Sequence, residues 1–76
     1  MQSTTGVLSD VSFDLISALQ NTLEAVTIYD TYIDDCEEAG DDQCRQLFEE
    51  LKGEEARQAG RLRQEFERLV REGKFQ

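Results

Sequence analysis

The sequence lacks proline, histidine and tryptophan altogether, and these absences narrow the folds and functions open to the chain. A proline ring removes a backbone donor and clashes within a helical turn, so its absence favours long uninterrupted helices. Without histidine, no Ser–His–Asp or Cys–His catalytic set can form, and no glycine-rich phosphate loop is present either. Hydrolase and transferase activities therefore have no support in the residues.

Hydrophobic runs are also short, and none approaches the roughly 20 residues that a membrane-spanning helix needs. The N-terminal segment MQSTTGVLSD has no basic region followed by an apolar core, so no signal peptide is visible. We therefore predict a cytoplasmic protein that has no membrane partner.

Basic residues are few, because eight Lys and Arg stand against 17 Asp and Glu and leave a net charge of −9. Such a surface repels nucleic acid phosphates and anionic lipids, so neither is an expected partner. It suits cations or a basic protein, although a charge of this size can also serve only to keep an oligomer soluble.

Hydrophobic residues recur at helical spacing, and alternation of period two never occurs. Residues 1–8 are predicted to be a flexible lead. A helix then follows over residues 9–39, with Ser9 or Asp10 able to cap its start. The apolar stripe of this helix consists of Ile16, Leu19, Leu23, Val26 and Ile33, with Leu15, Tyr29 and Cys36 on one side.

Gly40 marks the end of that helix, because glycine readily adopts the left-handed conformation of a C-terminal cap. A turn over residues 40–42 precedes a second helix over residues 42–72, which Gly73 ends. Residues 74–76 form a short tail. The stripe of the second helix steps by four and three residues through Cys44, Phe48, Leu51, Glu55, Gln58, Leu62, Phe66 and Leu69.

The short turn makes the helices antiparallel, so the predicted fold is all-α, a two-helix hairpin over residues 9–73. A chain of this length rarely buries a sufficient core alone, and two helices cannot cover both sides of each other's stripes. We therefore expect the chain to assemble with copies of itself into a four-helix bundle, by dimerisation or as a larger ring.

Three polar residues interrupt the stripes at about the same distance from the turn. Thr22 lies near the middle of the apolar face of the first helix, and Glu55 and Gln58 lie one turn apart on the second. The pattern predicts a buried polar layer, and a buried carboxylate must be paired, neutral or metal-bound. The layer either fixes register and oligomer state or, with Glu55 repeated by symmetry, holds a cation.

The segments LQNTLEAVTIYDTYI and LFEELKGEEARQAGRL resemble the two-helix unit of the ferritin-like superfamily, in the style of rubrerythrins and half-length encapsulated ferritins. The resemblance covers about residues 13–72. It implies a bundle that binds two irons through a Glu on one helix and a Glu-x-x-His on the next. Glu55 matches the Glu of that motif and Gln58 replaces its His. Thr22 replaces the first-helix ligand, seven residues before Tyr29.

Two of the three expected ligands are therefore replaced, which implies a lost or weakened di-iron site. Glu24 projects about 160° away from Thr22 and would serve only an outer metal site. We predict a non-catalytic, ferritin-like structural or interaction subunit without a cofactor, whose size also fits an accessory partner of a larger complex. The alternative is a divergent iron-binding protein of the ferroxidase or storage type, with Glu55 in an unusual carboxylate site.

Cys36 and Cys44 lie about equally far from the turn and are expected to face one another. They either form a disulfide or remain thiols that act as small hydrophobic residues, as a reducing cytoplasm favours. The acidic loop DDCEEAGDDQ superficially resembles a calcium loop, but Ala39 and Gln46 stand at two of its ligand positions. We therefore expect a solvated, capped turn there.

Overall fold

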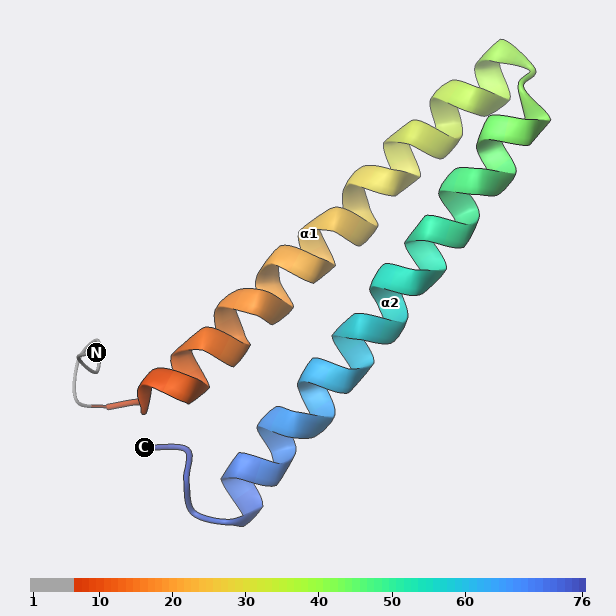
Figure 1. Ribbon diagram of the computed structural model, residues 1–76. Helices are drawn as coiled ribbons and strands as arrows, with labels where there is room; N and C mark the ends of the chain where they lie inside the picture. The colour runs from red at the N-terminus through yellow and green to blue at the C-terminus, as the bar shows by residue number, and fades with distance from the viewer. Residues whose placement is uncertain (1–6) are drawn as a thin grey trace.

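The computed structural model describes residues 7–76, and residues 1–6, most of the predicted lead, lie outside the described part. Helix α1 spans Asp10–Ala39 and helix α2 spans Asp42–Arg71, with 30 residues in each. Figure 1 shows the two helices side by side, joined by one tight turn, with both termini at the opposite end. The predicted all-α hairpin is confirmed, and its helices begin and end within one residue of the predicted bounds.

Local chemistry explains where each helix begins and ends. Ser9 caps α1 by accepting a hydrogen bond from the Ser12 amide, and Asp41 caps α2 by accepting one from the Cys44 amide at 3.0 Å. This bond lowers the pKa of the Asp41 carboxyl below its usual value. Gly40 ends α1 with a φ of 69°, a left-handed conformation that is easily reached by glycine.

The core of a single hairpin is thin. Among the described residues, the buried hydrophobic ones are Cys36, Ala59 and Leu69. The molecule measures 50 × 21 × 15 Å, and its radius of gyration of 16.5 Å exceeds the value of about 11 Å expected for a compact domain of this length. Much of the apolar surface of the hairpin therefore has no protein neighbour.

Aromatic residues pack at both ends of the hairpin. Near the turn, ring centroids lie between 5.3 and 6.1 Å apart in a cluster of Tyr29, Tyr32 and Phe48. At the other end, Phe75 of the tail packs edge-on against Phe66, with their centroids 5.2 Å apart. The Ser9 amide also donates to the Phe75 carbonyl at 3.1 Å, so the tail is tied to the start of α1.

The face of α1 that contacts α2 includes most of the predicted stripe but leaves out two of its residues. Thr22 is buried and Val26 is half-buried, whereas Ile16 and Leu23 are 38% and 52% exposed. These two residues lie about 100–120° around the helix from Thr22, so they occupy a flank of α1 rather than its contact line. In the described part of the chain, neither helix is apolar enough over a sufficient length to cross a membrane.

Candidate functional site

The residues of the predicted polar layer do not come together within one hairpin. Thr22 is buried, and its Oγ1 donates to the Ala18 carbonyl at 2.8 Å in its own helix. Glu55 is half-buried, and Gln58 is exposed. Ala59 takes the buried position on α2, because Gln58 lies about 100° around the helix from it. That a second hairpin encloses this polar layer remains a prediction.

This donor set does not fit a di-iron centre, which needs bridging carboxylates and imidazoles. The Thr22 hydroxyl is bonded within its own helix and Gln58 faces solvent, which leaves Glu55 as the carboxylate of the set. Glu24 is exposed and accepts a hydrogen bond from the Gln20 amide at 3.3 Å. In the described part of the chain, no three Cys, Asp or Glu side chains group closely enough to hold a metal ion.

Both cysteines are free thiols, with Cys36 buried and Cys44 exposed in a shallow groove beside the turn. Burial, followed by the nearby charge of Asp41, raises the pKa of the Cys36 thiol. A hydrogen bond to Asp41, together with the charge of that carboxylate, raises the pKa of Cys44. The two thiols are therefore protonated near neutral pH and are weak nucleophiles.

Replacing Asp41 by asparagine is expected to make Cys44 more reactive without unfolding the hairpin. Asparagine caps a helix as well as aspartate does, but it has no charge to disfavour a neighbouring thiolate. The pKa of Cys44 should therefore fall, and its alkylation by iodoacetamide at about pH 8 should accelerate several-fold. In the unmodified protein the pKa of Cys44 is raised above 9.0, the ordinary value for the thiol, so the alkylation rate should still be rising with pH at that point and level off only beyond it.

Mass spectrometry of timed samples measures this alkylation, and Asp42→Asn provides the matched control. Asp42 is the next residue along the chain and pairs with Arg45, so its neutralisation should leave the Cys44 rate unchanged. Equal rates in the Asp41→Asn and Asp42→Asn proteins would contradict the assigned role of Asp41.

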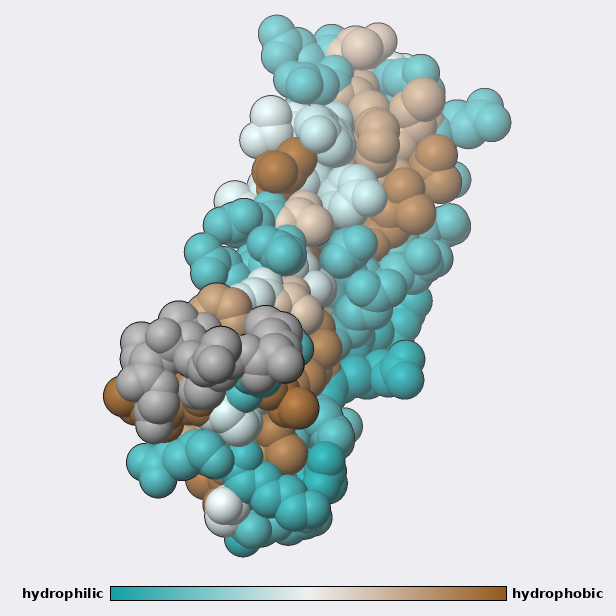
Figure 2. Space-filling model, turned by 60° about the vertical axis from the view of Figure 1, so that its left-hand side comes forward, coloured by the Kyte–Doolittle hydropathy of each residue, from teal (hydrophilic) through white to brown (hydrophobic). Residues whose placement is uncertain are grey.

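The most prominent surface feature is apolar area along α1. Two large exposed hydrophobic residues belong to α2. Six belong to α1: Val11, Phe13, Ile16, Leu23, Ile28 and Tyr32. Ile16, Leu19 and Leu23 line a shallow groove of about 380 Å³, which we call the α1 groove. Figure 2 shows hydrophobic residues in patches on one face of the hairpin, among polar ones. Ile16 and Leu23 are the members of this exposed set that share the α1 groove, and an exposed apolar groove of this kind marks an interaction site.

Charge is divided unevenly along the hairpin. All eight basic residues lie between Arg45 and Lys74, whereas α1 has eight acidic residues and no basic one. The turn half, residues 25–56, has eleven acidic and two basic side chains and a net charge of −9. The terminal half, residues 7–24 and 57–76, has six of each and is neutral. The whole net charge of the protein therefore resides beside the turn.

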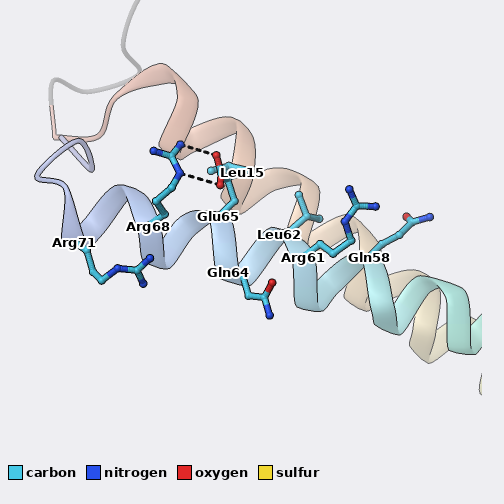
Figure 3. Close-up of a pocket in the computed structure, with 8 residues that line it drawn as sticks. All are labelled: Leu15, Gln58, Arg61, Leu62, Gln64, Glu65, Arg68 and Arg71. Atoms are coloured by element: carbon cyan, nitrogen blue, oxygen red, sulfur yellow. Dashed lines mark hydrogen bonds and ion pairs between the residues drawn. The ribbon is translucent and has the colours of Figure 1, made fainter.

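A second groove, of about 600 Å³, lies on α2 in the terminal half (Figure 3). Its lining combines Leu15 and Leu62 with three arginines: Arg61, Arg68 and Arg71. The guanidinium of Arg68 donates to both carboxylate oxygens of Glu65, at 3.0 and 2.6 Å, and this pairing lowers the pKa of that carboxyl. Arg61 and Arg71 form no ion pair with any described residue. We call this surface the arginine groove.

Comparison with known protein families, with characterised proteins and with solved structures finds no match to this chain. The ferritin-like resemblance therefore depends on the two sequence segments alone. Function has to be argued from the surface of the hairpin itself.

Proposed function

We propose that this protein is a structural, non-catalytic subunit that pairs with a second copy of itself through the α1 groove. The observation that carries the proposal is the α1 groove, whose hydrophobic residues Ile16 and Leu23 stay exposed beside a very thin core. Burying one such half-exposed side chain is worth about 1 kcal/mol, and a two-fold pair buries two copies of each, which works against the entropic cost of association. Two hairpins packed in this way make a four-helix bundle.

A second copy is a suitable partner because two-fold pairing lets one surface cover itself. The α1 groove is flanked by the polar residues Gln20, Glu24 and Thr27, which can form the rim of an apolar contact. The net charge of −9 keeps the resulting bundle soluble. The resemblance of residues 13–72 to the ferritin-like two-helix unit supports the same four-helix arrangement. A larger ring or complex would also form its contacts through the α1 groove.

Iron binding by the purified oligomer separates a structural subunit from an iron protein. After aerobic addition of Fe(II) and desalting, we expect only substoichiometric iron, because Glu55 has no imidazole and no second enclosed carboxylate beside it in the described chain. Elemental analysis measures the retained metal. The Glu55→Ala protein and its matched control Glu54→Ala, an exposed neighbour, should retain equally little.

The opposite result has a clear form. Stoichiometric iron retained by the unmodified protein and by Glu54→Ala, but lost in Glu55→Ala, would overturn the structural assignment. It would establish a divergent iron-binding protein in its place.

A further inference from the structure

We infer that the two copies pair antiparallel, so that the acidic turn half of one hairpin lies against the arginine-bearing terminal half of the other. This inference rests on the proposed self-association and adds the orientation of the partner. It also assigns a role to Arg71, near the end of α2, which receives acidic side chains of the second copy.

Charge balance distinguishes the two orientations in which two hairpins can face each other with two-fold symmetry. When the turns lie at the same end, a half with a net charge of −9 meets another of −9, and two neutral halves meet at the other end. When the turns lie at opposite ends, each half of −9 meets a neutral one. Packed helices lie about 8–10 Å apart, close to the screening length of about 8 Å at physiological salt, so the difference persists in solution.

Unpaired groups at the two ends are complementary in this orientation. Near the turn, four carboxylates of α1 form no ion pair with any described residue: Asp34, Asp35, Glu37 and Glu38. The one ion pair that links the described helices joins Lys52 to Asp30. At the other end of the hairpin, the guanidinium group of Arg71 is unpaired. Antiparallel pairing brings Arg71 to the level of the partner's turn and its carboxylates.

The position of the α1 groove along the helix is compatible with the same orientation. Leu23 lies close to the midpoint of α1, which runs from Asp10 to Ala39. A two-fold axis that passes near Leu23 and across the helix therefore places the α1 groove of one copy over the same groove of the other. The hydrophobic contact and the charge balance then favour one arrangement.

Distances between spin labels in the pair test the orientation. A single label is attached at position 43 of a Gln43→Cys protein in which Cys36 and Cys44 are replaced by alanine and serine. Turns at the same end would put the two labels within about 30 Å, since neighbouring helices are about 8–10 Å apart. Antiparallel pairing puts them at opposite ends of a molecule 50 Å long. A mixture with protein labelled at Gln76→Cys should then show a short distance from position 43 to position 76.

Sedimentation of the same labelled samples distinguishes the two ways of failing. A monomer at the labelling concentration would overturn the proposed function itself. A stable pair with a short distance between the two labels at position 43 would overturn the orientation and leave the function standing.

Charge reversal provides a second, independent test. The Arg71→Glu protein should dissociate several-fold more readily at low salt, and less so at about 0.5 M salt, because screening removes the repulsion. Arg71→Lys keeps the charge and should associate normally. Mixing the reversed protein with Glu37→Lys/Glu38→Lys should restore pairing. Unchanged association of the reversed protein at low salt would contradict the inferred role of Arg71.

Discussion

Replacing Ile16 and Leu23 together by aspartate is expected to abolish self-association while both helices of each chain remain folded. The two residues are 38% and 52% exposed in the single hairpin, so the hairpin itself loses little when they become polar. In the pair they are buried, at about 1 kcal/mol for each half-exposed side chain, and the pair contains two copies of each. A loss of about 3 kcal/mol or more corresponds to an increase of over roughly 100-fold in the dissociation constant.

Sedimentation equilibrium measures the dissociation constant, and far-ultraviolet circular dichroism checks that the helices are retained. The Asn21→Asp/Thr31→Asp protein is the matched control, because it adds the same two charges to exposed polar positions of α1. The control should associate nearly as well as the unmodified protein. A double variant at Ile16 and Leu23 that pairs as tightly as this control would exclude the α1 groove from the contact.

Leu69→Ala is expected to destabilise the folded protein by about 2–5 kcal/mol. Leu69 is only 5% exposed and is one of three buried hydrophobic residues among those described, so its truncation leaves a cavity in an already thin core. For a domain of this length, 1 kcal/mol shifts the midpoint of thermal unfolding by about 4–8 °C. The midpoint should therefore fall by at least about 8 °C.

Thermal and urea unfolding at one fixed protein concentration measure this effect. Val70→Ala is the neighbouring control, because Val70 is 51% exposed and its truncation should change stability by no more than about 0.5 kcal/mol. Equal destabilisation by the two substitutions would show that Leu69 does not anchor the contact between α1 and α2.

The helix ends were predictable because they depend on local chemistry. Ser9 and Asp41 offer side-chain oxygens to the first free amides of each helix. Gly40 and Gly73 adopt the positive φ that a helix terminus favours, at 69° and 70°. These preferences act over three or four residues, so they can be read without knowledge of the fold.

The contact line between the helices was harder to predict, because α1 is apolar over a broad arc. Several choices of inward face satisfy the spacing of its hydrophobic residues, and the structure selects the one centred on Thr22. Thr22 and Ala59 are small, buried and about equally far from the turn, so at this level the helices can approach closely. That selection moves Ile16 and Leu23 to the exposed flank. It also leaves Gln58 outside the polar layer in which it was expected.

The surface features depend on contacts between residues far apart in the sequence. The total charge of −9 is visible at once, but its division acquires meaning only when α2 folds back and places residues 57–76 beside residues 7–24. The packing of Phe75 on Phe66 likewise depends on how the tail leaves α2. Neither feature has a local signal comparable to a helix cap.

The dependence of thermal unfolding on protein concentration tests most directly whether one hairpin needs a second to complete its core. If folding is coupled to pairing, the midpoint should rise by several degrees as the concentration increases from about 1 to about 500 µM. The Ile16→Asp/Leu23→Asp protein should unfold at a lower midpoint that does not depend on concentration. A constant midpoint for the unmodified protein, together with a monomeric mass at the highest concentration, would contradict self-association as the basis of its function.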